Sequence, residues 1–214
     1  MSVAERAGTR DEILRVAAEL FFANGYEATT VREIAKELEI KSASIYYHFP
    51  DKEQILFEIV RDVLDRSLAG ISAALAGQTD AAPRLAALVV HHVALNAIRA
   101  REVTLAETEL RSLGGERRQH VLGQRDAHEA VLVGVLEDGR AANAFTLLDA
   151  KLTAYGVISM CQNVGIWFRE SGRLSLEQVA GTYANLALRL AGGTELPAAA
   201  LAALTRDAIA SYST

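Results

Sequence analysis

Apolar residues recur at helical spacing along nearly the whole chain, and no stretch shows the strict alternation of a half-buried strand. The first predicted helix covers residues 10–24 and carries its apolar side chains on one face: Ile13, Ala17, Leu20 and Phe21. Asn24-Gly25 then ends this helix, because glycine readily takes the left-handed conformation that closes a helix. The pattern predicts an all-α protein.

A second, shorter helix is predicted over residues 30–38. Thr30 and Glu33 have the spacing of a capping box, in which each side chain bonds to the backbone amide of the other residue. The apolar residues that follow repeat at i, i+3, i+4 and i+7: Val31, Ile34, Ala35 and Leu38. Residues 39–41 then form a tight turn into the next element.

A third short helix, residues 42–49, carries an outward face that is polar and uncharged. Ile45 and Phe49, four residues apart, anchor its other side, and Pro50 stops it. Two short helices joined by a tight turn make a helix-turn-helix; an ordinary helical hairpin is the alternative. The mixture of small polar and aromatic residues facing outward favours a helix that reads DNA.

The rest of the chain predicts further helices after a break near each glycine or proline cluster. A helix over residues 51–75 restarts after Pro50, and Asp149 and Ser175 are expected N-caps. The later helices are expected at 83–100, 102–112, 116–138, 149–170, 175–191 and 197–212. We expect two domains: a helix-turn-helix DNA-binding domain over residues 1–52 and a larger helical ligand-binding and dimerisation domain over residues 53–214.

Charge and cysteine content limit the possible functions. The chain has 214 residues, half of them hydrophobic, and a net charge of −5, so it is expected to bury a real core. Residues 1–52 contain seven Lys or Arg and nine Asp or Glu, so any DNA-binding surface must gather its few cations on one face. Cys161 is the single cysteine, and we expect no signal peptide and no apolar run of membrane-spanning length. A cytoplasmic protein without a membrane partner is predicted.

Three motifs at fixed spacing resemble the TetR family of bacterial regulators. They are Thr30-Val31-Arg32-Glu33-Ile34-Ala35, then Ile45-Tyr46-Tyr47-His48-Phe49, then Asp51-Lys52-Glu53, within a match over roughly residues 9–57. Glu39 departs from the pattern where the family usually has glycine, and Lys41 departs where a capping serine is common. The resemblance implies a helix-turn-helix regulator of double-stranded operator DNA.

The resemblance also implies which side chains contact DNA. Those expected to face the bases are Ser42, Ala43, Ser44 and Tyr46. Those expected to contact phosphates are Thr30, Tyr47, His48 and Lys52, with Arg32 an additional contact and Lys41 supplying a charge in place of a lost hydroxyl. The alternatives are core packing for Tyr46 and a plain surface position for His48.

The last two long helices are expected to form a homodimer through a four-helix interface, which pattern and resemblance both favour. The expected interface residues are Ile158, Cys161, Phe168, Val179, Tyr183, Leu186 and Leu190. A dimer would place two reading helices about one DNA turn apart, roughly 34–36 Å.

An effector site is expected within residues 83–170. Four residues share one helical face: Gly156, Met160, Asn163 and Trp167. In a ligand pocket the glycine would leave space, the methionine would adapt its shape, the asparagine would orient the ligand, and the tryptophan would stack on it. An ordinary core stripe explains the same spacing.

The larger domain also resembles, more loosely, the branch of the family that responds to acyl-coenzyme A thioesters. That resemblance adds candidates to the ligand site: Arg125, His128, Val131, Val135, Arg169 and Arg173. Solvent-exposed arginines on helix ends are the alternative for each arginine.

Enzyme chemistry is not indicated. The chain has no Gly-rich phosphate loop and no His-Glu-x-x-His motif, and no nucleophile is paired with a base. The histidines at 91, 92, 120 and 128 lack metal-ligand spacing, so no metal or cofactor is expected. We predict a DNA-binding repressor released from its operator by a small hydrophobic effector, an acyl-coenzyme A thioester among the options. A helical protein–protein adaptor that kept the motif without binding DNA is the alternative.

Overall fold

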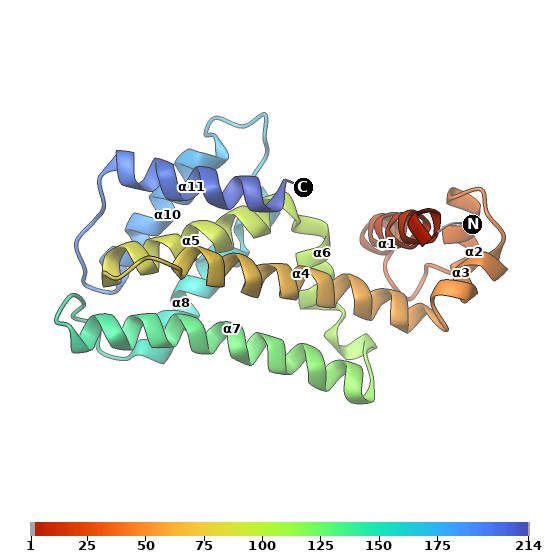
Figure 1. Cartoon of the computed structure of the whole chain (residues 1–214), viewed down its shortest axis with the longest axis horizontal. Helices are drawn as coiled ribbons and strands as arrows, with labels where there is room; N and C mark the ends of the chain where they lie inside the picture. Colours follow the sequence, from red (N-terminus) through yellow and green to blue (C-terminus); the bar gives the residue numbers. More distant parts are fainter. Residues whose placement is uncertain (1–2, 214) are drawn as a thin grey trace. The chain divides into compact units, whose positions relative to one another are not determined.

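The computed structural model describes residues 3–213, with their side chains from Thr9 onward, and this whole range consists of helices and the turns between them. The all-α prediction is confirmed. The elements of the first half are α1 (Val3–Asn24), α2 (Val31–Glu37), α3 (Ser42–His48), α4 (Lys52–Leu75), α5 (Ala81–Ile98) and α6 (Ala100–Thr108) (Figure 1). The second half contains the short 3-10 helix η1 (Leu110–Ser112), α7 (Gly115–Ala141), α8 (Ala150–Gln162), α9 (Val164–Trp167), α10 (Leu176–Leu190) and α11 (Ala198–Tyr212).

The helices group into two compact units that do not follow a single cut after residue 52. Unit 1 contains the residues up to Leu64 together with Arg101–Leu122, and unit 2 contains Asp65–Ala100 and the residues from Gly123 onward. The long helices α4 and α7 therefore contribute residues to both units. Because α6, η1 and the start of α7 belong with α1–α3, unit 1 includes a segment that lies far along the chain.

Unit 1 is built around the helix-turn-helix. The face predicted for α1 is buried as expected, with Ile13 and Ala17 at 0% exposure, and it packs near α2, whose Ile34 is also fully buried. Gly25, at φ +88°, ends α1 in the left-handed conformation, and its amide donates to the Phe21 carbonyl at 3.0 Å. The expected stop is confirmed.

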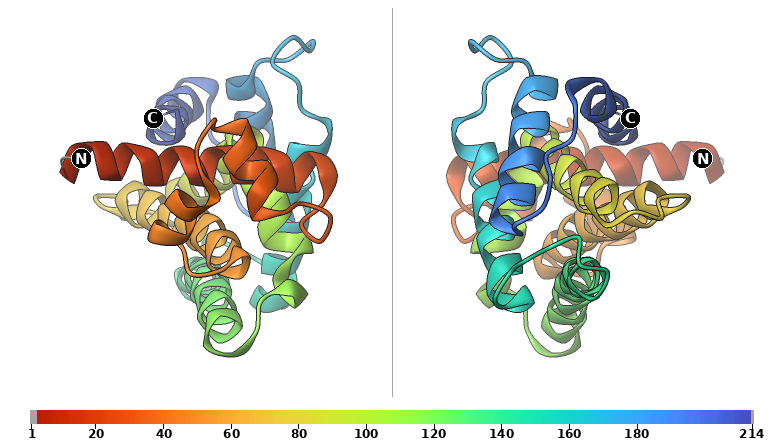
Figure 2. Two further views of the ribbon diagram at one scale, coloured as in Figure 1. Left: turned by 90° about the vertical axis from the view of Figure 1, so that its right-hand side faces the viewer. Right: turned by 90° about the vertical axis from the view of Figure 1, so that its left-hand side faces the viewer.

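Unit 2 is organised around α5. Helices α10 and α11 both pack along it, and α8 and α9 contact it as well (Figure 1 and Figure 2). By length and composition alone α5 could cross a membrane, a feature that the sequence prediction overlooked, yet most of it is buried inside the protein. Because Leu85, Val89 and Val93 are each 0% exposed, α5 is the core helix of this unit.

Capping predictions are confirmed at three sites. Thr30 and Ser175 each form a complete capping box, and the Asp149 carboxylate accepts from the Leu152 amide at 2.7 Å. Two predicted helices are interrupted: the one over 102–112 is α6 followed by the 3-10 helix η1, and the one over 149–170 breaks at Asn163, where α8 ends and the short α9 begins. Hydrophobic spacing continues through the break, and for that reason the pattern alone could not locate it.

Candidate nucleic-acid interface and effector region

Helix α3 is fixed to the core of unit 1 by two side chains and presents the rest of its surface outward. Ile45 is 0% exposed and Phe49 is 1% exposed, and the Phe49 amide closes the helix by donating to the Ile45 carbonyl at 2.9 Å. Burying the large apolar side chains of Ile45 and of the C-cap residue Phe49 holds the backbone of this short helix in place. The anchoring predicted for Ile45 and Phe49 is confirmed.

The outward face of α3 contains the residues expected to contact DNA. Tyr46 is 55% exposed and Tyr47 is 68% exposed, whereas tyrosines in a protein core are almost covered. Ala43 and Ser44 are exposed, and Ser42 and His48 are half-buried. The alternative that Tyr46 packs into the core is therefore excluded, and the base and phosphate contacts of this face stay predictions.

Lys52 contacts the protein itself rather than standing free at the surface. Its Nζ donates to the carbonyl oxygens of Tyr26 at 2.8 Å and Thr29 at 3.0 Å, and it lies 4.2 Å from the centroid of the Tyr26 ring. Because an ammonium group has three donors, these acceptors occupy most of its capacity. In this structure the Lys52 side chain holds the loop between α1 and α2, and whether it also contacts a phosphate is a question for the salt dependence of operator binding.

Thr30, Arg32 and Lys41, also expected to contact DNA, differ in whether their side chains already bind other groups of the protein. The Thr30 hydroxyl donates to Glu33 at 2.8 Å and its backbone amide donates to the same carboxylate at 2.7 Å, which lowers the pKa of Glu33. Arg32 and Lys41 are exposed, and Lys41 precedes α3 without any side-chain cap bond. These two cations are available to phosphates, while Thr30 is also a structural cap.

The turn between α2 and α3 is strained at the position where the sequence departs from the TetR pattern. Glu39 has φ +53°, in the left-handed region that costs a non-glycine residue about 1–2 kcal/mol. The next amide, of Ile40, donates to the Ala35 carbonyl at 2.9 Å, so the turn closes in spite of this strain. The departure at Glu39 therefore costs stability but does not change the path of the backbone through the turn.

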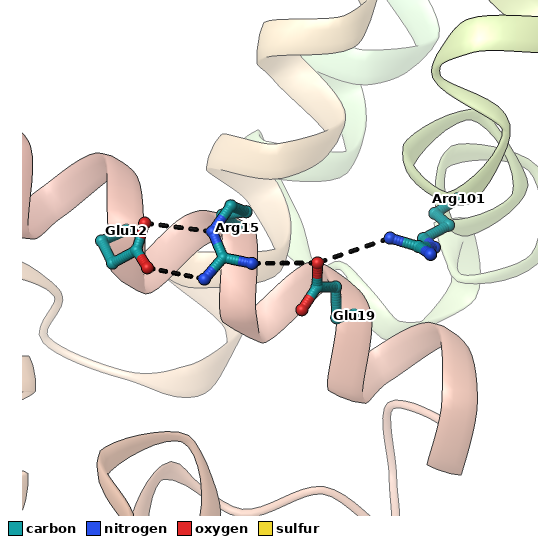
Figure 3. A network of polar contacts seen from close by, with 4 residues as sticks. All are labelled: Glu12, Arg15, Glu19 and Arg101. Carbon is teal, nitrogen blue, oxygen red and sulfur yellow. Dashed lines mark hydrogen bonds and ion pairs between the residues drawn. The ribbon is translucent and has the colours of Figure 1, made fainter. Parts of the chain in front are cut away.

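Two groups of ion pairs attach α6 and the start of α7 to the N-terminal part of unit 1. Figure 3 shows the first: Arg101 of α6 lies 3.4 Å from Glu19 of α1, and Glu19 also pairs with Arg15 at 3.0 Å. In the second, Arg117 of α7 donates to both oxygens of Asp51 at 3.1 Å. Partial burial of Asp51 would raise its pKa, but the hydrogen bonds from Arg117 and from the Gln54 amide outweigh that effect and lower it. Sequence reasoning missed both groups because their members are far apart in the chain.

A polar cluster is buried in unit 2 between α5 and α7. The rings of His92 and His128 stack with their centroids 5.0 Å apart at an interplanar angle of 20°. Asn96, one turn after His92, donates to the His92 carbonyl at 2.8 Å. The Oδ1 of Asn96 and the Nε2 of His128 are buried and form no hydrogen bond within the described part of the chain. Buried polar atoms without partners are costly, so this cluster is a candidate place for a bound molecule to supply hydrogen bonds.

Burial controls the charge of this histidine pair. It lowers the pKa of His92 to about 3, with a further contribution from His128, and lowers the pKa of His128 to about 4. Both rings are consequently neutral near pH 7, and each offers one donor and one acceptor nitrogen. His128 was expected at the ligand site; His92 and Asn96 were not, because the ring that stacks on His92 comes from another helix.

Most residues expected to line an effector pocket from α8 and α9 lie at the protein surface instead. Gly156 and Asn163 are exposed, and Trp167 is 47% exposed. The side-chain amide of Asn163 donates to the Ser159 carbonyl one turn earlier at 2.7 Å, so it already has a partner within the protein. The remaining members are placed as follows: Met160, Arg125 and Val131 half-buried, Val135 in the core at 1% exposure, and Arg169 and Arg173 exposed.

The two arginines of the segment between α9 and α10 differ in their contacts. Arg169 donates from Nη1 to the carbonyls of Ile166 at 3.1 Å and Phe168 at 2.6 Å, which fixes the turn after α9. Arg173 is exposed. Neither lies beside the histidine cluster in any contact between described residues, so a phosphate contact by either arginine stays a prediction.

An apolar surface on α8, α9 and α10 contains part of the expected dimer interface. Large side chains gather there at high exposure: Leu152 at 69%, Tyr155 at 45%, Ile166 at 70%, Leu186 at 40% and Leu190 at 51%. We call these residues, with Trp167, the α8–α10 surface. The helices approach closely, since a side chain added at Gly156 would meet Leu190 at 3.3 Å.

Two of the expected interface residues are wrong. Cys161 is 0% exposed and Val179 is 2% exposed, because both point into the core of their own protomer and cannot reach a partner. Ile158, Phe168 and Tyr183 are half-buried, and the Tyr183 ring lies 6.3 Å from that of Trp167. A helical spacing argument identifies a stripe but does not say which side of the helix meets the core.

Metal and redox chemistry find no support among the described residues. No group of three or more His, Cys, Asp or Glu side chains in that range could hold a metal ion. Burial raises the pKa of the Cys161 thiol, which disfavours the reactive thiolate.

Two family models match the chain. The model described as bacterial regulatory proteins of the tetR family matches residues 13–59, and the model described as the tetracyclin repressor-like C-terminal domain matches residues 78–191. The first covers α2 and α3 with the anchoring and exposed residues described above. The second begins before α5 and ends after α10.

Individual relatives agree with these matches. The HTH-type transcriptional repressor KstR2 of Mycolicibacterium smegmatis is 32% identical over 195 residues, which is 90% of this chain and 94% of that protein. A tetR-family regulatory protein from Rhodococcus RHA1 superposes with a TM-score of 0.82 at 30% identity, covering 91% of this chain and all of that one. AibR, solved in complex with isovaleryl coenzyme A and operator DNA, has a TM-score of 0.76 at 26% identity, covering 86% of this chain and 99% of that one.

Proposed function

The chain belongs to the TetR family of bacterial transcriptional regulators, and from this premise we propose that it is a homodimeric repressor released from operator DNA by a coenzyme A thioester. Membership makes it a DNA-binding regulator and not an enzyme. A cytoplasmic location is part of the same proposal. The identity of the effector and the residues that contact each partner go beyond what family membership establishes.

The outward face of α3 is the observation that carries the DNA-binding proposal. Two anchors fix the helix while Ala43, Ser44 and Tyr46 remain exposed, so small and aromatic side chains can approach base edges in the major groove. Exposed Arg32 and Lys41 add positive charge next to this face. The first 52 residues have a net negative charge, but α3 contains no Asp or Glu, so no carboxylate lies on the reading face itself.

The α8–α10 surface supports a two-fold dimer. Monomeric proteins rarely leave so many large apolar side chains together in water. A second copy that presents the same two helices would cover Leu186, Leu190 and Tyr155 and form a four-helix interface. Trp167 and Gly156, expected at the ligand site, then belong to this interface.

The buried cluster of His92, Asn96 and His128 supports an effector site in unit 2. An incoming amide group would supply a donor N–H to Asn96 Oδ1 and a partner to His128 Nε2. Coenzyme A thioesters carry such groups next to an apolar acyl chain, and AibR is a relative solved with one. We assign Arg125 and Val131, which lie on α7 close to His128, to the same site.

Helix α7 offers a route for coupling, because its residues contribute to both units. Its later turns contain His128, and its first turn contains Arg117, which pairs with Asp51 just before α4 begins. An effector releases DNA only if it binds one arrangement of α7 more tightly than the other. The ion pairs of Arg117 and Arg101 are the contacts through which such a change would reach α1 and α3.

A DNA-binding titration tests the proposal. The full-length protein is titrated by fluorescence anisotropy against the DNA upstream of its own gene, with isovaleryl coenzyme A, longer acyl thioesters or free coenzyme A added. We expect specific binding that an acyl thioester weakens at least about tenfold and free coenzyme A does not. Specific binding unaffected by any thioester would reject the effector class alone, while no binding even at low salt would favour the adaptor alternative.

A further inference from the structure

A second hollow of unit 2 lies away from the histidine cluster, where the last turns of α4, the first half of α5 and α11 meet. Its volume is about 250 Å³, and small residues create the space, among them Gly70, Ala74 and Ala87. Since one water occupies about 30 Å³ of the liquid, this volume suits an organic molecule of roughly eight non-hydrogen atoms. It is far too small for a coenzyme A thioester, so it is a separate site from the proposed effector region.

Polar groups line the hollow from two helices. Asp207 and Ser211, one turn apart, contribute from α11, and His91 contributes from α5. Ala87 is 0% exposed and His91 is 5% exposed, whereas Asp207 and Ser211 are exposed. The imidazole is therefore at the floor of the hollow, and the carboxylate is at its mouth.

The floor is held by a contact that requires glycine. The Nδ1 of His91 lies 3.4 Å from the hydroxyl of Tyr212, and a side chain added at Gly70 would come within 2.5 Å of that hydroxyl. Gly70 thus lets Tyr212 close the floor while the alanines beside it leave the space above open. Gln78, in the segment between α4 and α5, is a further polar lining residue, and the rest of the lining is apolar.

The charge of this lining is unbalanced. Asp207 forms no ion pair with any part of the chain that the structure describes. His91 does not neutralise it, because burial lowers the pKa of the imidazole and the opposing effect of Asp207 is smaller. The other titratable group that faces His91 is Tyr212, and burial raises the pKa of its hydroxyl to about 12, so it is neutral as well. The hollow therefore offers one carboxylate and no cation.

We propose that this hollow binds a small organic amine. Its ammonium group donates to the Asp207 carboxylate at the mouth, and its short apolar body fills the space between the alanines of α4 and α5. The residues of α11 lie outside the segment 78–191 matched by the C-terminal domain model. The hollow shares no lining residue with the proposed operator, dimer or coenzyme A thioester contacts.

Calorimetric titration of the full-length protein tests this site with matched probes. Cyclohexylamine and benzylamine are compared with cyclohexanol and benzyl alcohol, which share their carbon skeletons but carry no charge. We expect saturable binding of the amines with a dissociation constant on the order of 1 mM, typical of ligands this small, and at least about fivefold weaker binding of the alcohols.

Three variants locate the binding. Asp207→Asn should weaken the amines at least about fivefold, and Ala74→Leu should abolish binding by filling the space. Asp126→Asn, which removes an exposed carboxylate on α7 away from the hollow, is the matched control and should bind as the parent does. Circular dichroism melting confirms that each variant is folded.

Equal affinity for amines and alcohols would overturn the proposal, as would equal amine affinity of folded Asp207→Asn and the parent. The absence of saturable amine binding below about 10 mM would overturn it too.

Discussion

Replacing Lys52 by methionine tests how the DNA-binding unit holds its first loop. The ammonium group donates to the carbonyls of Tyr26 at 2.8 Å and Thr29 at 3.0 Å, and it lies over the Tyr26 ring at 4.2 Å. Methionine preserves most of the apolar length of the side chain and removes the charge and the donors. The loop between α1 and α2 then loses the hydrogen bonds and the cation–π contact that Lys52 provides, so it opens more often.

The magnitude follows from these contacts. A hydrogen bond to a charged group contributes about 1.5–3 kcal/mol when buried, and screening at this half-exposed site reduces each of the two short bonds to about 0.5–1 kcal/mol. The cation–π contact adds about 0.5–1 kcal/mol. Together these give a loss of about 2 kcal/mol, equivalent to roughly thirtyfold more frequent local opening.

Hydrogen exchange of the Glu33 and Ile34 amides, at the start of α2, measures this opening directly. We expect both amides to exchange roughly thirtyfold faster in Lys52→Met and at the parent rate in the control Lys36→Met, because Lys36 is exposed on the same helix. The salt slope of operator binding should change by less than about half a unit, since carbonyls rather than a phosphate hold the ammonium group. Unchanged exchange together with a slope smaller by about one unit would refute this reasoning.

The remaining predictions concern the turn, the histidine pair and the dimer. Glu39→Gly should raise the free energy of unfolding of unit 1 by about 0.5–1 kcal/mol, because relief of left-handed strain exceeds the entropic cost of glycine; a lower denaturation midpoint would contradict this. His92 and His128 have pKa values lowered to about 3 and about 4 from 6.5, so the unfolded state binds more protons and the free energy of unfolding should fall as pH drops from 6.5 towards 4. Calorimetric melting of His128→Asn should show a flatter dependence over that pH window, and an identical profile would argue against the burial of neutral rings. Leu190→Asp should convert the dimer into monomers in analytical ultracentrifugation while the helical circular dichroism signal remains, and an unchanged sedimentation coefficient would exclude the α8–α10 surface.

Local signals in the sequence were sufficient for the helices and for the anchored face of α3. Capping boxes at Thr30 and Ser175 depend on residues three apart, and Ile45 and Phe49 depend on residues four apart, so the information lies within one or two turns. The helix break at Asn163 gave no such signal. The cost of Glu39 in the turn required its backbone angle, which the structure alone provides.

Tertiary contacts decided the parts of the site that sequence reasoning placed wrongly. Val179 lies on an apolar stripe like Leu190, but only packing shows that one meets the core and the other meets solvent. His92 drew attention as a metal candidate, and its actual neighbour is the ring of His128 on α7. The bond from Lys52 to the Tyr26 carbonyl, 26 positions earlier in the chain, likewise gave no local signal in the sequence.

Selection of bound DNA from a random library, compared between the parent protein and Ser44→Ala, tests most directly whether the outward face of α3 reads operator sequence. Ser44 is exposed on that face, and removing its hydroxyl should change base preference at one position in each of two symmetric half-sites while the rest of the sequence preference remains. Identical preferences of the two proteins, or selected sites without two-fold symmetry, would contradict the assignment of α3 as the reading helix of a dimer.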